Sequence, residues 1–316
     1  MKIAAVLLSS FLHAAGAWAQ AYPTKPVKVI VPFAPGGGSD IVARAVTTKL
    51  QDALGQPFVI ENRGGAGGLV GTEAAARAPA DGYTILIMSD SFPVLAATHK
   101  PAFDPMNSLV PVAQISIAPF GLMVHPSVPA NTVAEFIALA KAKPESFSYG
   151  SSGSGGLTHL ITEMFSQMAG IRMVHVPYKS TGAAMPDFLS GTITAYVGNV
   201  SALLPQVNAG KLKLLAVTNA ERWPLLPNVP TIAETIPGFA ADPWFGLFVP
   251  RGTPAAIIET LNAAVNKMAA EEELRKNFAG QGMLPRAGSP AAFGEVVRRD
   301  YARWVKVVQD IGFKPE

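Results

Sequence analysis

Short apolar runs alternate along the chain with segments in which apolar residues recur every three or four positions. The runs at 27–33 and 83–88 are typical of buried strands. Between them, a segment with helical spacing begins near Ser39, which we expect as the N-cap, and stops at Gly55. Because strands that alternate with helices form parallel sheets, the pattern predicts an α/β fold with mainly parallel sheets flanked by helices.

The same pattern continues to the end of the chain and predicts two lobes. A proline-rich tract at 222–244 is expected to link the middle of the chain back to its first part. We expect one lobe from residues 20–120 with 232–316, and a second from 121–231. The other expected strands are 58–61, 112–117, 122–125, 147–149, 172–178, 193–197, 212–217 and 245–249, and the other expected helices are 69–77, 132–143, 157–168, 183–189, 202–208, 254–270, 272–278 and 290–310.

Residues 1–19 have the pattern of a secretory signal. Lys2 precedes a short apolar run, and the stretch closes on the small-residue pattern Ala17-Trp18-Ala19. The run is too short to span a bilayer, and no later stretch has the ~18 consecutive apolar residues that a membrane helix needs. We therefore expect cleavage between Ala19 and Gln20 and a periplasmic protein.

Composition narrows the class of protein further. The chain has no cysteine, which excludes disulfides, thiol catalysis and a lipid-modified N-terminal cysteine. Residues 1–19 hold one basic residue and no acidic one, so 24 Lys and Arg against 22 Asp and Glu remain after cleavage. This small positive balance argues against a nucleic-acid surface.

Two glycine-rich segments follow expected strands and open expected helices. The first covers residues 33–40 with the sequence FAPGGGSD, and the second covers residues 151–159 with the sequence SSGSGGLTH. A helix start presents unpaired N–H groups and a positive dipole end, which together bind anions. Glycine lets the backbone approach a ligand, although a tight turn alone also explains it. Since each lobe has one such loop, we expect the two loops to clamp a carboxylate.

Other chemistries fit the sequence poorly. Near Gly65 the glycine spacing departs from a dinucleotide fingerprint because Val70 occupies the third glycine position, and no P-loop occurs. The histidines lack paired-ligand spacing, so neither a metal nor a cofactor is expected. No Gly-x-Ser-x-Gly elbow occurs. One enzymatic alternative stays open, a periplasmic hydrolase or lyase with Ser152 or Ser154 as nucleophile and His159 as its partner.

Several side chains near the loops have two interpretations. His159 either packs as a hydrogen-bonded core histidine or orients the loop and reaches the ligand. Asp40 either compensates the helix dipole or meets the ligand or its water shell. Trp244 and Phe245 either belong to the core or wall the cleft. Tyr178 closes an expected strand, where side chains can face a binding crevice.

Stretches spread over the chain resemble one known family. They read YPTKPVKVIVPFAPGGGSDIVAR, VIENRGGAGGLVG, DGYTIL, GSSGSGGLTHL, MAGIRMVHVPYKSTGAAMPDFLSG, AGKLKLLAVT and FGLFVPRGTPAAI. In combination they resemble the periplasmic solute receptors of the tripartite tricarboxylate transporter system, the Bug family. The resemblance implies a two-lobed periplasmic binding protein of the Venus-flytrap, type II-like kind. It also implies a receptor that closes on a small organic acid and delivers it to a two-component membrane permease.

The resemblance also implies where the ligand lies. One carboxylate would be held by main-chain groups and bridging waters from residues 33–40 and 151–159. Three positions depart from the family pattern: Gly64 stands where proline is usual, Arg251 replaces a small residue, and Gly198 precedes Asn199 where the family often has aspartate. The missing carboxylate at 198 favours a plain dicarboxylate, aromatic ones included, over an amino acid.

We therefore expect a monomeric receptor that captures a di- or tricarboxylate without chemistry and hands it to permease subunits. A sensor that docks on a membrane signalling protein stays open as an alternative. The expected ligand-binding residues are Phe33, Pro35, Gly36, Gly37, Gly38, Ser39, Asp40, Ser89, Ser151, Ser152, Gly153, Ser154, Gly155, Gly156, Thr158, His159, Tyr178, Asn199, Trp244 and Phe245.

Overall fold

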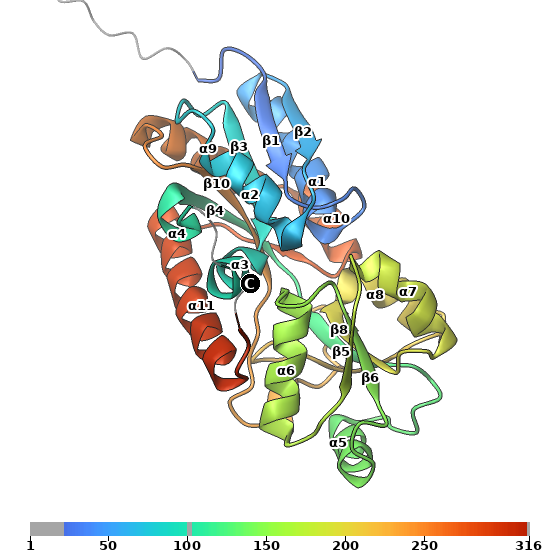
Figure 1. Ribbon diagram of the computed structural model, residues 1–316. Coiled ribbons are helices and arrows are strands. Elements are labelled where there is room, and N and C mark those ends of the chain that lie inside the picture. Colours follow the sequence, from blue (N-terminus) through green and yellow to red (C-terminus); the bar gives the residue numbers. More distant parts are fainter. Residues whose placement is uncertain (1–21, 100–102, 315–316) are drawn as a thin grey trace, which may run out of the picture.

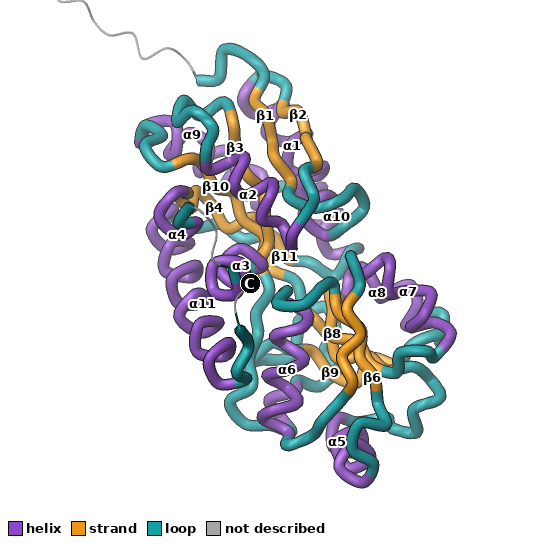
Figure 2. Tube along the Cα trace, in the orientation of Figure 1, coloured by secondary structure: helices purple, strands orange, loops and turns teal. Residues whose placement is uncertain are grey.

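Two β-sheets organise the chain, one above the other in the view of Figure 1 and Figure 2. The computed structural model describes residues 22–99 and 103–314. The six-stranded sheet has the order β11-β4-β10-β3-β1-β2, and the five-stranded sheet has the order β7-β6-β8-β5-β9. The first contains β1 (Val27–Val31), β2 (Phe58–Asn62), β3 (Thr84–Ser89), β4 (Leu109–Ile117), β10 (Trp244–Pro250) and β11 (Leu284–Pro285), and the second contains β5 (Phe120–Val124), β6 (Ser148–Ser151), β7 (Val174–Pro177), β8 (Ala195–Asn199) and β9 (Lys213–Val217).

Both sheets are mixed rather than mainly parallel. Strand β1 runs parallel to β2 and β3, whereas β10 is antiparallel to β3 and β4. Likewise, β6 runs parallel to β7 and β8, whereas β5 is antiparallel to β8 and β9. Strands β5 and β10 are each the first strand after the chain crosses from one sheet to the other, and each enters in the reverse direction. The predicted α/β class with two sheets is confirmed.

Helices pack on the faces of both sheets. The first part of the chain forms α1 (Gly38–Leu54), α2 (Leu69–Ala76), α3 (Ser91–Thr98) and α4 (Pro105–Ser108), and the last part forms α9 (Ala255–Ala269), α10 (Glu272–Gly280) and α11 (Pro290–Asp310). The middle part forms α5 (Val133–Ala142), α6 (Leu157–Ala169), α7 (Thr181–Ser190) and α8 (Val200–Asn208), and short 3₁₀ turns lie at Ala66–Gly68 and Ile232–Glu234.

The start of α1 differs from the prediction. The helix begins at Gly38, its N-cap is Gly37, and Ser39 lies within the first turn. The prediction of Ser39 as N-cap is therefore wrong, because glycine at 37 and 38 lets the helix begin two residues earlier without a capping side chain. Its end at Gly55, which adopts φ 71°, is as predicted. Helix α3 was not predicted, since it is short and contains Pro93.

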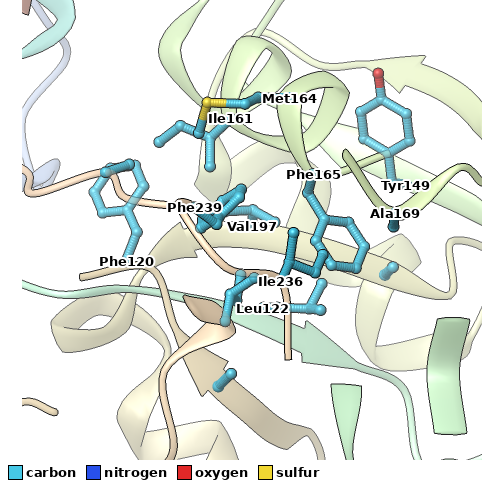
Figure 3. Close-up of a cluster of buried hydrophobic side chains, with 14 of the residues drawn as sticks. Phe120, Leu122, Tyr149, Ile161, Met164, Phe165, Ala169, Val197, Ile236 and Phe239 are labelled. Atoms are coloured by element: carbon cyan, nitrogen blue, oxygen red, sulfur yellow. The ribbon is translucent and has the colours of Figure 1, made fainter. Parts of the chain in front are cut away.

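The core of the five-stranded sheet lies beneath α6. Figure 3 shows Ile161 and Phe165 of α6 together with Leu122 and Val197 of the strands, and these side chains are fully buried. Phe239, from the segment that returns to the first sheet, closes the same cluster. This packing fixes α6, and therefore its first residues, against the sheet.

Helix α11 belongs to both halves of the molecule and runs along the side of both in Figure 1. Its residues Phe293 and Val297 lie in a core cluster of the six-stranded sheet. Further along the same helix, Trp304 and Val307 lie in the core beneath α6. A helix of 21 residues is ~31 Å long, so one rigid element joins the two cores.

The two chain crossings between the sheets lie side by side. Ala118 donates a hydrogen bond from its N–H to the carbonyl of Pro243 at 3.1 Å, and Thr218 donates to Phe120 at 2.9 Å. The second crossing is the proline-rich tract, in which Ile232–Glu234 forms a single turn capped by Thr231. These bonds pair the two crossings, so the sheets are joined by one hydrogen-bonded connection rather than by two independent segments.

The predicted signal sequence, residues 1–19, lies outside the described residues. Within residues 22–99 and 103–314, no helix is both long enough and apolar enough to cross a membrane.

Candidate functional site

The two glycine-rich loops have the same local backbone. One joins β1 to α1 and the other joins β6 to α6, in the upper and lower halves of Figure 1. Their N-caps, Gly37 and Gly156, have φ/ψ of −77°/165° and −76°/166°. The residues before them, Gly36 and Gly155, adopt φ of +83° and +70°, a region that favours glycine. Glycine at these positions is therefore required by the shape of the loop.

Both helix starts keep their first N–H groups free of helical partners. The first helical hydrogen bonds run from Ile41 to Gly37 and from Leu160 to Gly156, each at 3.0 Å. The N–H groups of residues 38–40 and 157–159 precede these bonds, and neither N-cap supplies a side chain to accept from them. Each loop thus offers several backbone donors at the positive end of a helix, which is suited to an anion.

Each loop is braced by the side chain four residues after the positive-φ glycine. The N–H of Gly36 donates to Oδ2 of Asp40 at 2.9 Å. The N–H of Gly155 donates to Nδ1 of His159 at 3.0 Å. The carboxylate of Asp40 and the imidazole of His159 therefore hold their loops in the same way at equivalent positions. Orienting the loop was part of one of the two interpretations of His159.

The carboxylate of Asp40 has its hydrogen-bond partners in the first loop, in α1 and at the end of β2. Its side chain is 2% exposed, and it accepts two hydrogen bonds from Arg44 and one from Asn62 in addition to that from Gly36. Burial acts to raise the pKa of Asp40, but the hydrogen bonds from Arg44, Gly36 and Asn62 outweigh it and lower the pKa. Asp40 is therefore an ionised brace whose charge is matched by Arg44.

His159 lies in an aromatic stack. Its ring is 4.1 Å from that of His175, which in turn stacks on Tyr149 at 4.9 Å. Because Nδ1 accepts from Gly155, the neutral ring carries its proton on Nε2. Burial lowers the pKa of His159 to about 4. Burial, and then the charge of His159, lowers the pKa of His175 to about 4, so both rings are neutral at neutral pH.

The hydroxyl groups of the second loop bond to one another. Thr158 accepts from the N–H of Ser152 at 2.9 Å, and the two hydroxyls lie 3.0 Å apart. The Ser151 hydroxyl lies 2.7 Å from Nε2 of His175. These bonds order the loop, and the N–H groups at the start of α6 remain for a ligand.

The arrangement expected of a serine hydrolase is not formed by the predicted residues. Ser152 bonds to Thr158, and Nδ1 of His159 is occupied by Gly155. In the part of the chain that the structure describes, no hydrogen bond joins Ser152 or Ser154 to His159. Within the second loop, Ser151 bonds a histidine, His175, but Ser151 is fully buried.

Gly38 brings the two sheets together at the first loop. A Cβ placed on Gly38 would lie 2.9 Å from Cζ of Phe245 and 3.5 Å from Nδ2 of Asn199. Phe245 belongs to the first sheet, whereas Asn199 ends β8 of the second. The structure therefore places these two predicted residues beside the start of α1.

The other predicted residues take different places. Ser89 ends β3 opposite Phe245, and its hydroxyl bonds that of Ser91 at 3.0 Å. Tyr178 donates from its N–H to Ser151, and its hydroxyl donates to Asp187. Trp244 is 1% exposed, in the core, with its Nε1–H donated to Asp300 at 2.8 Å. Phe33 is partly buried against a core cluster, and Pro35 and Ser154 are exposed.

Sequence reasoning missed several residues that shape the loops. His175 reaches the second loop because β6 and β7 pair in parallel with Tyr149 opposite His175. Asn62 reaches the first loop from the end of β2 and also donates to the carbonyl of Phe33 at 3.0 Å. The only sequence signals were that Asn62 directly follows the expected strand 58–61 and that His175 lies within the expected strand 172–178.

Two open hollows lie elsewhere on the molecule. One, of about 460 Å³, lies between α5, the last residues of α6 and residues 235–237. The other, of about 550 Å³, lies between α6 and α11. Met168 lines both, and neither is lined by a residue of the two loops. The candidate site is therefore defined by the paired loops.

Comparison with known proteins gives matches along almost the entire chain. The profile of the tripartite tricarboxylate transporter family receptor matches residues 42–313. Protein BugT of Bordetella pertussis is 35% identical over 318 residues, which cover 99% of this chain and 98% of BugT. The solved structure of R. palustris Rpa4515 with adipate has a TM-score of 0.88 at 36% identity, covering 93% of this chain and 100% of that one. MatC from Rhodopseudomonas palustris with bound malate has a TM-score of 0.83 at 30% identity, covering 91% and 100%.

The solved relatives share the two-sheet fold described above, and so does the periplasmic binding protein BugD, with a TM-score of 0.84 at 30% identity, covering 93% of this chain and 100% of that one. Agreement in sequence, in length and in fold leads to one assignment. This chain belongs to the tripartite tricarboxylate transporter family of receptors, to which the Bug proteins also belong.

Proposed function

We propose that this receptor binds a small organic carboxylate in the periplasm and delivers it to the membrane permease of a tripartite tricarboxylate transporter. The observation that carries the proposal is the pair of equivalent loops, each with an uncapped helix start. Solved relatives bound to adipate and malate support a carboxylate as the ligand class. The N-terminal signal pattern supports export.

The loops would neutralise the ligand with backbone N–H groups rather than with cationic side chains. A hydrogen bond to a charged group contributes ~1.5–3 kcal/mol, so a few of them can supply most of a micromolar affinity. The two predicted lobes, residues 20–120 with 232–316 and residues 121–231, would close on the ligand. A ligand that contacts both lobes favours their closed arrangement, because it binds that arrangement more tightly.

The residue at 198 favours an acid without an amino group. A Cβ on Gly198 would lie 2.5 Å from Cε1 of Tyr196. The tyrosine ring, held by a hydrogen bond to Thr181 at 2.8 Å, thus occupies the space that a side chain at 198 would need. With no acidic side chain available there to pair with an ammonium group, we favour di- and tricarboxylates, aromatic ones included.

A thermal-shift screen tests the ligand class. Adipate, malate, citrate, phthalate and glutamate would be compared at equal concentration and ionic strength, with adipamide as the uncharged control for adipate. We expect at least one dicarboxylate to raise the melting temperature and adipamide to leave it unchanged. No stabilisation by any of the acids, or equal stabilisation by adipamide, would contradict the proposed ligand class.

Delivery to a permease needs a separate measurement. Cells that carry the cognate permease would be assayed for uptake of the radiolabelled acid with and without this receptor. Uptake that does not depend on the receptor would separate binding from transport and would favour a sensing role.

A further inference from the structure

The two equivalent glycines that precede the N-caps have different surroundings. A Cβ on Gly36 would meet no atom within 4 Å, and Gly36 is exposed. A Cβ on Gly155 would lie 2.8 Å from Cζ and 3.2 Å from Cε1 of Phe313, and Gly155 is buried. At this equivalent position, a side chain from a distant part of the sequence covers Gly155 but not Gly36.

Phe313 contacts both residues of the brace in the second loop. Besides lying against Gly155, its ring meets that of His159 edge to face, with centroids 5.8 Å apart. Thr98 of α3 lies 3.4 Å from the same Cβ position on Gly155. The hydrogen bond from Gly155 to His159 is thus enclosed by residues of the first and last parts of the chain.

Helix α11 determines where Phe313 lies. The helix is anchored in the core of the six-stranded sheet by Phe293 and in the core beneath α6 by Trp304. After the helix, Gly312 adopts φ 66°, and the N–H of Phe313 donates to the carbonyl of Val308 at 3.0 Å. This turn at the helix end directs the ring back toward the loop.

We propose that Phe313 is a positioning residue for solute binding, which acts by holding the second loop in its binding conformation through Gly155 and His159. The inference rests on the proposed function for the identity of the solute, but the position of the loop can be tested without one.

The difference between the two braces explains why the second loop needs this support. At the first loop, Gly36 donates to an ionised carboxylate that is itself held by Arg44. At the second, Gly155 donates to a neutral imidazole. Hydrogen bonds to an ionised partner are roughly twice as strong as neutral ones, so the second loop is held less firmly by its own side chain. Packing of the Phe313 ring against Gly155 and His159 compensates for this weaker hydrogen bond and keeps the second loop ordered.

Phe313→Ala tests the proposal, with Phe147→Ala as the matched control. Phe147 is likewise a partly buried aromatic packed on the core beneath α6, but it precedes β6 and so lies at the far end of that strand from the loop. We expect Phe313→Ala to raise the Kd for adipate or malate by about tenfold, because the loop must then be ordered on binding. Phe147→Ala should change the Kd by less than about twofold, within the scatter of distant substitutions.

A second readout needs no ligand. Amide hydrogen exchange at Gly155 should accelerate by about tenfold in Phe313→Ala and stay unchanged in Phe147→Ala. Equal effects of the two substitutions on affinity and exchange, or none from Phe313→Ala, would overturn the proposal. The milder pair Phe313→Leu and Phe147→Leu gives the same comparison if an alanine variant does not fold. If the wild type binds neither acid, the proposed function fails for these acids, while exchange at Gly155 still decides the role of Phe313.

Discussion

The N–H of Gly155 donates to Nδ1 of His159 at 3.0 Å, and the ring of His159 stands where the other loop has the carboxylate of Asp40. The likeness ends one turn further along each helix. Asp40 is followed four residues later by Arg44, which pairs with it, whereas His159 is followed four residues later by Glu163, which accepts from the hydroxyl of Tyr149. The first loop is therefore held by a matched pair of charges and the second by a neutral ring.

Substitutions at His159 should separate hydrogen bonding from charge. The side-chain oxygen of asparagine can accept from Gly155 as Nδ1 does, so we expect His159→Asn to keep the solute Kd within about threefold. His159→Val leaves a buried N–H without its partner, which costs ~1–3 kcal/mol, and should weaken binding about tenfold or more. His159→Asp brings a carboxylate near Glu163 without a counterpart to Arg44, so it should lower the melting temperature most.

Isothermal titration calorimetry and thermal unfolding of the three variants check this order. The asparagine variant serves as the control for loss of the ring stack. If it bound as weakly as the valine variant, the bond to Gly155 would not be what orders the loop.

The stacked histidines make stability depend on pH. Burial holds the pKa of His159 and of His175 at about 4, below the ordinary value of 6.5. Between these values the unfolded chain takes up protons that the folded chain does not, so stability should fall as pH decreases from 6.5 to about 4. Above pH 6.5 both states are unprotonated at these sites, and this contribution is fully present.

Unfolding measured from pH 7.5 to 4 checks the pH dependence. The double variant His159→Asn with His175→Gln removes both titrating rings and keeps a hydrogen-bonding group at each position. We expect its stability to fall less steeply over this interval than that of the wild type. Parallel curves would show that other groups cause the loss.

Serine at the first N-cap should change stability and affinity in opposite directions. A Cβ on Gly37 would meet only the carbonyl oxygen of Ala34, at 3.6 Å, so a small side chain fits. The hydroxyl of Gly37→Ser can accept from an N–H of the first turn, which stabilises the helix start by a few tenths of a kcal/mol. Because the serine hydroxyl then accepts from an N–H group that the solute would otherwise bind, we expect the Kd for the solute to rise about tenfold.

Gly37→Val is the companion substitution. Its side chain cannot cap the helix, so the free energy of unfolding should fall by up to ~1 kcal/mol while binding again weakens tenfold or more. Calorimetry and denaturant unfolding give both quantities. An unchanged affinity in both variants would remove the first loop from the binding site.

Asp90 should be replaceable by asparagine with a gain in stability. It is 4% exposed, and its Oδ1 has no hydrogen-bond partner among the described residues. Burial, and then the charge of Asp300, raises its pKa well above the ordinary value. Folding therefore favours the protonated acid, and this contribution to stability is lost as pH rises through the folded pKa.

The asparagine in Asp90→Asn cannot ionise. The free energy of unfolding of this variant should therefore exceed that of the wild type by more at pH 8 than at pH 4. Since the unpaired oxygen is buried, we expect the difference to reach ~1–3 kcal/mol. Denaturant unfolding at the two pH values measures it. A gain of the same size at both would exclude ionisation of Asp90 as the cause.

The sequence was sufficient to predict the loops but not what surrounds them. A tight turn from a strand into a helix needs glycine at fixed positions, so it can be recognised from neighbouring residues alone. Residues 36–38 and 155–156 supply these glycines. Trp244 and Phe245 show the limit, because neighbours in a strand face opposite sides of the sheet and only the register decides which one meets Gly38. The contact of Phe313 with Gly155 joins residues far apart in sequence and has no local signal. The antiparallel insertion of β10 between β3 and β4 is likewise a property of the whole topology.

The order of strands in the six-stranded sheet also determines how much of the chain must be synthesised before that sheet can fold. Strand β10 lies between β3 and β4. Strands β1 to β4 are therefore synthesised long before the strand that joins β3 to β4. The five-stranded sheet uses one continuous stretch and can assemble earlier, yet part of its core comes from α11 at the end of the chain. A chain that ends before β10 therefore lacks both the central strand of one sheet and the helix that completes the core of the other. Such a chain should remain sensitive to proteolysis, and only the full-length product should resist it.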